Sequence, residues 1–507
     1  MKSISISYPL SLPIAVLACL PVLVLIWLAD TPHVIFQTRN LALLANTIML
    51  TGLTALGAVA IGVPLALVTA YVRLPLGKLW LVLLAAPLAL PSYIGAFTMF
   101  AAFGPGGEIQ SITGLATPSF SGLIGSSIVM AFYTYPFVLM TTRSALLNLD
   151  VNQLNAARTL GLGVWGCLWR VVLPRIRNSV AAGALLCALY ALSDFGTPAI
   201  LGLDTLTRVI YVEYNAFALG QAALLSLQLL FIVGLVIVLE SRVAAIPERP
   251  GRSLSLQPTP WQARLIPLTF IPVIGFALVL PLSIFSLWLW REGAAGFKWE
   301  YAFNSVQASL LAALAAAVLA LPLANAALVG RFGRVMERVT YLGFGIPGIV
   351  MGTALVYLGL QLAFLYQTLA LLVIAYVMRF LPLAVGSART ALESLEGSLP
   401  KAAQTLGAGP LEVFRRVSLP LTRRGLIAGM ALVFLESMRE LPATLLLAPT
   451  GFETLATYLW RVYEAGYFGR AAIPGLLLIL LSILGLGLML MGEKRADFAV
   501  LNDTERR

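Results

Sequence analysis

The chain has 507 residues, of which 60% are hydrophobic and 11% are charged, and its mean hydropathy is +0.92. These values exclude a soluble globular protein, because apolar runs of about 20 residues recur and each can cross a hydrocarbon core of about 30 Å as a helix. The net charge of +11 does not indicate a nucleic-acid partner, since the basic residues gather in loops that can all lie on one side of a bilayer.

Apolar runs predict the membrane spans in chain order. A first half, residues 1–240, has runs near 9–29, 43–70, 79–103, 122–147, 178–202 and 219–240. A charged, Pro-rich stretch over 241–264 is interpreted as a cytoplasmic linker between halves. The second half, residues 265–495, has runs near 265–290, 304–329, 336–360, 365–388, 424–448 and 472–492, and a cytoplasmic tail follows at 496–507. The prediction is an all-α polytopic membrane protein with about twelve spans.

Two polar segments between spans, here called the islands, carry one signature. The first lies within 150–177 and the second within 393–424, and each has Ala-Ala, then Thr-Leu-Gly, then Leu-Pro. The matching positions differ by a constant 246 and are Ala156, Ala157, Thr159, Leu160, Gly161 and Pro174, with Ala402, Ala403, Thr405, Leu406, Gly407 and Pro420. The composition predicts a short helix, a glycine turn and a second helix, with alanines small enough for close contact with another protein.

The repeat extends beyond the islands. Asn46-Thr47 matches Asn304-Ser305 at a slightly larger offset, and Asp194 falls opposite Glu440. With about six spans in each half, both halves enter the membrane in the same orientation and form parallel repeats. Lys and Arg are concentrated in segments that include both islands, which predicts that the islands and both termini face the cytoplasm.

The islands resemble the "EAA" loop of the inner-membrane permeases of binding-protein-dependent ABC importers, although Asn155 and Lys401 stand where that loop has its glutamate. In that family the loop is a coupling helix that docks in a groove of an ATPase subunit. The resemblance implies a type I permease fold of two fused halves, each of six helices, in a bacterial inner membrane. It also implies a periplasmic solute-binding protein and two ATPase subunits that bind ATP-Mg.

ATP hydrolysis is expected on a separate polypeptide, because the chain contains no GxxxxGK[ST] phosphate loop. We therefore expect a subunit that is not an enzyme and that binds no cofactor itself. An intramembrane enzyme is the weakest alternative, since the sequence has no His/Cys cluster, paired-Asp motif or nucleophile elbow.

Two intramembrane segments give a hint about the substrate. Residues 193–198 and 439–447 resemble segments of ferric-iron importer permeases, and thiamine, phosphonate and polyamine permeases share parts of them. Ionisable side chains within a membrane usually face a bundle interior or a water-filled path, and carboxylate and phenolate oxygens suit ferric iron. The predicted translocation path comprises Tyr190, Asp194, Glu436, Arg439 and Glu440, without a firm metal site.

Two other interpretations of these residues stay open from the sequence. Arg439 could pair with a glutamate such as Glu440 and only hold the span in register. Alternatively, Glu436 and Glu440 could form the ion relay of a secondary transporter, although such a protein needs no pair of docking loops. Proline and glycine interrupt several of these spans and are candidate gate elements, notably Pro87, Pro91, Pro198, Gly343, Gly345, Pro347, Gly348 and Pro442.

Overall fold

The computed structural model describes residues 4–29, 37–115, 117–243, 257–294, 296–393 and 398–484. Most of the expected linker, residues 244–256, and the whole expected tail, residues 496–507, lie outside these ranges. Within the described ranges every regular element is a helix. The predicted all-α fold is therefore confirmed.

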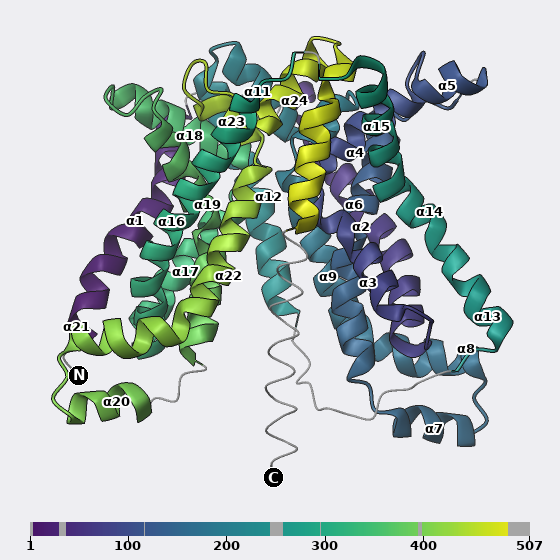
Figure 1. The fold of residues 1–507 in the computed structure, drawn as a ribbon, viewed down its shortest axis with the longest axis horizontal. Coiled ribbons are helices and arrows are strands. Elements are labelled where there is room, and N and C mark those ends of the chain that lie inside the picture. Colours follow the sequence, from purple (N-terminus) through teal and green to yellow (C-terminus); the bar gives the residue numbers. More distant parts are fainter. Residues whose placement is uncertain are drawn as a thin grey trace.

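The first half forms twelve helices, some of them short (Figure 1). They are α1 (Ile4–Leu28), α2 (Thr38–Tyr71), α3 (Gly77–Ala85), α4 (Ser92–Phe103), α5 (Glu108–Thr113), α6 (Gly122–Leu147), α7 (Val151–Thr159), α8 (Val164–Cys167), α9 (Leu173–Ser193), α10 (Gly196–Ile200), α11 (Leu206–Asn215) and α12 (Leu219–Arg242).

The second half repeats this order from Pro260 onward. Its helices are α13 (Pro260–Leu265), α14 (Ile271–Ile274), α15 (Leu280–Glu292), α16 (Trp299–Val329), α17 (Arg331–Gly345), α18 (Gly348–Gln361), α19 (Leu369–Glu393), α20 (Ser398–Thr405), α21 (Pro410–Val413), α22 (Leu419–Met438), α23 (Pro442–Leu447) and α24 (Leu455–Glu464). A last apolar helix covers Phe468–Leu484.

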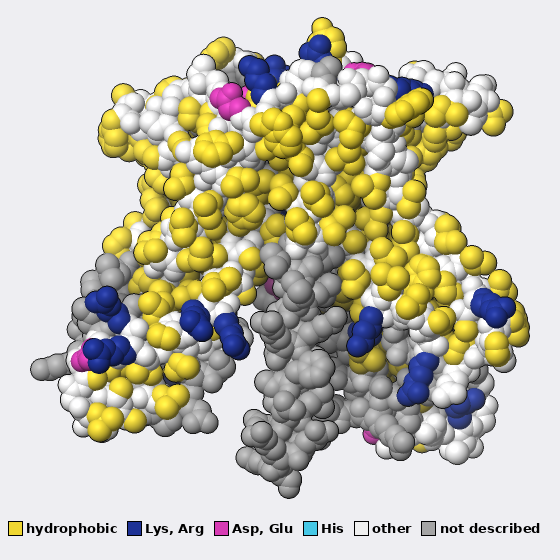
Figure 2. Space-filling view, viewed as in Figure 1, with side chains coloured by type: hydrophobic (Ala, Val, Ile, Leu, Met, Phe, Trp, Pro, Cys, Tyr) yellow, Lys and Arg dark blue, Asp and Glu magenta, His cyan; other side chains and the backbone are white. Residues whose placement is uncertain are grey.

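Length and hydropathy identify the spans among the described residues. Eight helices are long and apolar enough to cross a membrane, and the number rises to ten if each of two bent helix pairs, α3 with α4 (91°) and α17 with α18 (101°), is one span. Shorter apolar helices, Leu12–Leu28 and Phe468–Leu484, stand at the beginning and the end of this series. Apolar side chains cover the face between two polar ends, as a bilayer-spanning protein requires (Figure 2).

The two islands, α7 and α20, lie at the same end of the bundle, here called the island end (Figure 1). Helices α11 and α24 lie at the opposite end, here called the far end. The two lobes of the molecule diverge toward the island end and meet at the far end. Both copies of the signature therefore face the same side of the membrane.

The first span of each half packs on the other half. Helix α1 packs against α16, α17 and α18, which belong to the second half. The continuous helix of α13–α15 packs against α3, α4 and α6 of the first half, and Figure 1 shows these two helices on opposite flanks. Each lobe is therefore built from both halves of the sequence, so neither half is a separate structural unit.

An aromatic cluster joins the two halves of the sequence at the far end. The Phe97 ring lies 5.6 Å from Trp288, 5.7 Å from Tyr463 and 5.6 Å from Phe468, measured between centroids. Phe97 is fully buried on α4, whereas its three partners belong to the second half. Aromatic pairs at such separations stabilise a contact beyond the area they bury. The far end is thus one of the regions where the halves hold together.

Candidate functional site

The first island is a short helix with a defined beginning and end. Asp150 caps α7 by accepting a hydrogen bond from the Asn152 amide at 3.0 Å. The helix ends at Thr159, and Gly161 two residues later has a φ of +87°, a left-handed conformation that residues other than glycine rarely adopt. The Leu162 amide then donates back to the Ala157 carbonyl at 3.1 Å, a Schellman-type closure.

The second island has the same hydrogen bonds at the same positions. Gly407 has a φ of +88°, and the Ala408 amide donates to the Ala403 carbonyl at 3.1 Å. The hydroxyls of Thr159 and Thr405 each donate to the carbonyl three residues earlier, at 2.8 and 2.7 Å. The Thr-Leu-Gly signature therefore encodes one backbone turn, built twice.

The leucine of that signature is the most exposed part of each turn. Leu160 is 85% exposed and Leu406 is 88% exposed, although both are apolar. Ala156 and Ala402 are exposed as well, whereas Ala157 turns into the bundle and is 7% exposed. Each island therefore presents a leucine and one alanine as an apolar tip away from the membrane, a surface typical of a contact with another protein.

A π-helical turn joins each island to its membrane helix. These turns are Leu168–Val172 and Phe414–Ser418, directly before the Leu-Pro pairs of α9 and α22. Pro174 and Pro420 lack an N–H, and a proline ring collides with the carbonyl four residues earlier in a regular α-helix. The wider π-turn relieves that collision. The closing Leu-Pro of the signature is therefore the feature that places a wide turn between island and span.

Two short helices and two bent spans form what we call the gate, at the far end. Helix α10 follows α9 and packs against α4, while α23 follows α22 and packs against α18. Pro91 and Pro347 stand at the bends, immediately before α4 and α18. The proline breaks expected from the sequence are confirmed at these positions. Carbonyls that a bend releases from the helical pattern need other donors, because lipid supplies none.

In the first half, neutral donors surround the carboxylate of Asp194. Its Oδ2 accepts hydrogen bonds from the hydroxyls of Ser92 at 2.7 Å and Thr197 at 2.6 Å, and its Oδ1 accepts from the Gly196 amide at 3.0 Å. The Tyr190 hydroxyl lies 3.4 Å from the Ser92 oxygen. Asp194 thus joins the short helix α10 to the bend before α4, and Tyr190 lies beside this contact.

In the second half, the equivalent carboxylate belongs to Glu440 and pairs with an arginine. Its Oε2 lies 2.6 Å from Nη1 of Arg379, and its Oε1 accepts from the Ala443 amide at 3.1 Å. Both side chains are buried, with 7% and 13% of their surfaces exposed. The interpretation that pairs Glu440 with Arg439 is therefore wrong, because α19 supplies the partner instead.

Arg379 is the gate residue that the sequence analysis missed. At the offset of 246 it corresponds to Tyr133, so the second half has a charged side chain where the first half has a phenol. A single arginine within an apolar run is a sequence feature from which this residue could have been predicted. A β-carbon on Gly348 would collide with both Arg379 and Glu440. Glycine after Pro347 therefore provides the space for this ion pair, at the place where the first half has Ser92 beside Asp194.

Arg439 forms an ion pair with Glu436, three residues earlier on α22. Its Nη1 also donates to the carbonyls of Leu88 at 3.1 Å and Ala89 at 3.0 Å, which belong to the bent span of the first half. The structure thus brings all five predicted path residues to the gate, in two sets. Tyr190 and Asp194 form the set from the first half, and Glu436, Arg439 and Glu440 form the set from the second half.

The gate does not assemble a metal cage from carboxylates. Among the described residues, no group of three or more His, Cys, Asp or Glu side chains is placed to hold a metal ion. Glu436 and Glu440 are both paired with arginines, and Asp194 is surrounded by neutral donors. A transport path has to release its cargo, so occupied carboxylates are compatible with passage but not with tight storage.

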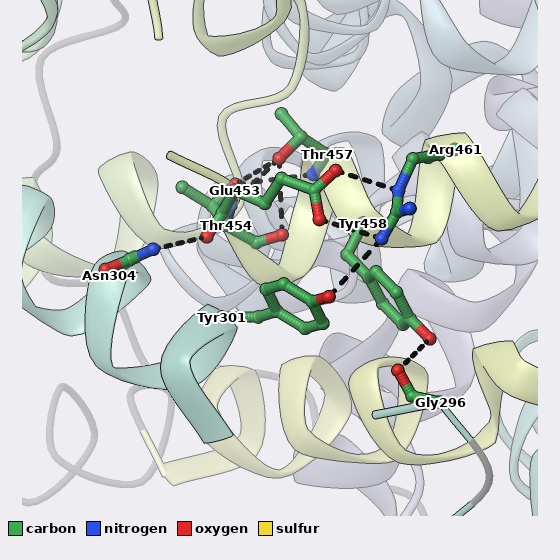
Figure 3. Close-up of polar contacts among 8 residues, drawn as sticks. All are labelled: Gly296, Tyr301, Asn304, Glu453, Thr454, Thr457, Tyr458 and Arg461. Atoms are coloured by element: carbon green, nitrogen blue, oxygen red, sulfur yellow. Dashed lines mark hydrogen bonds and ion pairs between the residues drawn. The ribbon is translucent and has the colours of Figure 1, made fainter. Parts of the chain in front are cut away.

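At the far end, matching joints fix α11 and α24 to the spans beneath them. Figure 3 shows the joint of the second half, where Asn304 donates to the Glu453 carbonyl at 3.0 Å and Arg461 pairs with the Glu453 carboxylate. The Tyr458 hydroxyl donates to the Gly296 carbonyl at 3.0 Å. Burial raises the pKa of this phenol above its usual value, which favours the protonated form that donates this hydrogen bond.

The first half has an equivalent joint. Asn46 donates to the Asp204 carbonyl at 3.0 Å, and the Thr47 hydroxyl accepts from the Leu206 amide at 3.0 Å. Ser305 accepts from the Leu455 amide at 2.8 Å in the corresponding place. The Asn-Thr and Asn-Ser pairs that revealed the repeat therefore support the extramembrane helices.

Comparison with known proteins agrees with this two-fold geometry. The family described as "binding-protein-dependent transport system inner membrane component" matches the chain twice, over residues 62–249 and 309–497. The chain belongs to this family. Both matches begin beyond the first span of each half, the span that crosses to the other lobe. The secondary-transporter alternative is set aside, and this subunit is a multi-pass inner-membrane permease of an ABC importer.

Individual relatives align with most of this chain or with about a third of it. The Fe(3+)-transport system permease protein FbpB 2 of Haemophilus influenzae is 30% identical over 489 residues, 92% of this chain and 94% of the relative. The ferric transport system permease protein FbpB of Actinobacillus pleuropneumoniae is 23% identical over 88% of this chain and 70% of the relative. The molybdenum transport system permease protein ModB of Azotobacter vinelandii is 30% identical over 34% of this chain and 79% of the relative.

Proposed function

We propose that the permease moves ferric iron across the inner membrane, from a periplasmic binding protein at the far end to the cytoplasm at the island end. The observation that supports iron is the extent of the match. The two relatives named for ferric or Fe(3+) transport align over 92% and 88% of the chain, whereas the molybdenum relative aligns over 34%. The fused two-half architecture is shared along its length with the iron permeases.

The islands are proposed to dock two copies of a separate ATPase. Each exposes a leucine on a fixed glycine turn, with Leu160 and Leu406 in matching positions. Two identical contacts fit two copies of one partner better than one copy. ATP-driven movement of an island would reach the gate along α9 or α22, since each of these helices runs from a π-turn to Asp194 or Glu440.

The same proposal predicts which face of the permease contacts the binding protein. Helices α11 and α24 are held at the far end by equivalent joints, one in each half. One binding protein that spans both helices would therefore contact both halves of the permease. Lys and Arg in the segments at the island end support a cytoplasmic position for that end, by the positive-inside rule.

Subunit stoichiometry tests the docking part of this proposal. We expect native mass spectrometry of the complex purified through the full-length permease to show one copy of this chain and two ATPase subunits. Leu160→Asp and Leu406→Asp should each reduce co-purification of the ATPase, because a charge would replace the apolar tip. Phe217→Asp is the matched control, since Phe217 is 91% exposed at the far end. A homodimer of this chain, or a single ATPase, would contradict the proposal.

Uptake measurements test the substrate. Cells that express the permease with its partners should accumulate radiolabelled ferric iron, and cells that lack the permease should not. Excess molybdate and excess sulfate serve as competitors, because transporters of these anions are among the relatives. Accumulation of labelled molybdate or sulfate that depends on the permease, without iron accumulation, would assign a different cargo.

A further inference from the structure

The guanidinium of Arg439 connects the two halves at the gate. Nε and Nη2 bind Glu436, while Nη1 donates to the carbonyls of Leu88 and Ala89 at 3.1 and 3.0 Å. Glu436 lies three residues before Arg439, near the end of α22, so that ion pair stays within the second half. The two hydrogen bonds to carbonyls are the ones that cross between halves.

Those two carbonyls are available because the first half bends there. Ala86–Ala89 form a 3₁₀ turn, and Pro91, which has no N–H, stands two residues later at the 91° bend. Carbonyls at such a break need a donor from elsewhere in a low-dielectric region. Only 20% of the Arg439 side chain is exposed, so its hydrogen bonds are shielded from water and are stronger than surface contacts.

The arrangement is one-sided. The position equivalent to Arg439 in the first half is Ser193, at the offset of 246. A serine hydroxyl has one hydrogen to donate and cannot bridge a carboxylate and two carbonyls, as a guanidinium with five N–H donors can. The repeat is therefore asymmetric at this level, since the guanidinium that binds both a carboxylate and two carbonyls comes from the second half.

We propose that Arg439 is a latch that keeps the far end closed and that has to leave the Leu88 and Ala89 carbonyls before that end can open. Glu436 remains bound to Arg439 during this movement, because Glu436 lies in the last turn of α22 and Arg439 is the residue that directly follows this helix. The paired charge is thus never left alone in the membrane. The latch rests on the proposed function in one respect, namely that import requires the far end to open and close.

Thiol labelling from the far side tests the latch without ATPase or substrate. In a full-length chain with Cys19, Cys167 and Cys187 replaced by alanine, Ser193→Cys places a reporter inside the gate. A membrane-impermeant methanethiosulfonate is applied to right-side-out vesicles. We expect Arg439→Gln to raise the labelling rate about tenfold or more, because a hydrogen bond to a charged group contributes at least that factor to an equilibrium. Arg439→Lys keeps the positive charge but lacks the several N–H donors of the planar guanidinium, so it should raise the labelling rate less.

Two controls define the result. Arg208→Gln removes an arginine at the far end whose partner, Asp204, belongs to the same half, and it should leave the labelling rate unchanged. In inside-out vesicles, Arg439→Gln should not accelerate labelling, since the effect belongs to the far end. Equal rates in the parent and both Arg439 variants, at matched protein levels, would overturn the latch. Because iron plays no part in the assay, this failure is distinguishable from a failure of the proposed transport function.

Discussion

The islands and the gate show opposite relationships between the two halves. In the islands, hydrogen bonds, glycine conformation and exposed leucine recur position by position, with φ values of +87° and +88°. In the gate, equivalent positions carry different chemistry, since Tyr133, Tyr190 and Ser193 correspond to Arg379, Glu436 and Arg439. The backbone of the repeat is kept in both places, but the side chains that make the contacts of the gate differ in charge between the halves.

The difference follows from what each region contacts. Under the proposed docking of two copies of one partner, the two islands need the same surface, so a change in one copy alone would impair one of two equal contacts. The gate is where the halves meet each other, and a contact between two different chain segments has no need of symmetry. One half can then supply cations and the other can supply carbonyls and hydroxyls, as Arg439 and Leu88 do.

The largest effect is expected from the glycine turns. Gly161→Trp or Gly407→Trp should abolish transport and uncouple ATP hydrolysis while the protein still inserts, because the left-handed conformation costs a non-glycine residue about 1–2 kcal/mol and the ring blocks the docking surface. Uptake, ATP hydrolysis and membrane abundance provide the measurements. Gly163→Ala and Gly409→Ala are matched controls, since a β-carbon at either position meets nothing within 4 Å. Normal uptake in both tryptophan variants would show that the islands do not couple.

The next effect distinguishes the two acidic residues of the gate. Glu440→Gln should lower membrane abundance and thermal stability strongly, since breaking a buried ion pair and leaving Arg379 unpaired costs about 3–5 kcal/mol. Asp194→Asn should be milder, about 1–3 kcal/mol, because its partners are neutral donors. Fluorescence-detected thermal unfolding of the two variants in the same detergent measures this difference. Equal destabilisation would mean that the ion pair contributes no more than the neutral hydrogen bonds.

A smaller effect should come from the π-turns, and it should be equal in the two halves. Pro174→Ala and Pro420→Ala remove the collision between the proline ring and the preceding turn, so the π-turn can become α-helix. The loss of its one extra residue would rotate the island relative to its membrane helix by about 100°. Transport should fall in both variants at normal abundance. Leu173→Ala and Leu419→Ala retain the prolines and serve as controls. A loss in only one variant would show that the islands are not equivalent in operation.

The smallest effect is expected at Glu436. Glu436→Gln removes the charge but leaves the hydrogen bonds from Arg439 to the Leu88 and Ala89 carbonyls, and 29% of the glutamate side chain is exposed. Abundance should stay near that of the parent, while iron uptake falls because the carboxylate that a cation would meet is lost. Iron uptake and immunoblotting, measured on the same preparation, distinguish a loss of transport from a loss of protein. Unchanged uptake would remove Glu436 from the path.

Prediction from sequence succeeded where the controlling physics is local. The length of an apolar run, the left-handed turn at Gly161 and the break at Pro91 each depend on a few neighbouring residues, so the spans, islands and bends were predictable. The partner of Glu440 was not, because Arg379 is 61 positions away on another helix and helix rotation decides which side chains meet. Arg439, only one residue away, points to Glu436 and to the first half instead.

The sequence alone determined that the protein is a two-fold helical membrane protein with two matched islands on one side. Hydropathy, charge asymmetry and a constant offset are properties of the chain order and need no tertiary information. Only the tertiary structure decided that α1 and the helix α13–α15 cross to the opposite lobes, and that Arg439 joins the halves through two backbone carbonyls. Transmembrane helices of similar hydropathy can pack on any neighbour. Which helices pair therefore depends on side-chain fit and on which interrupted backbone needs a hydrogen-bond donor.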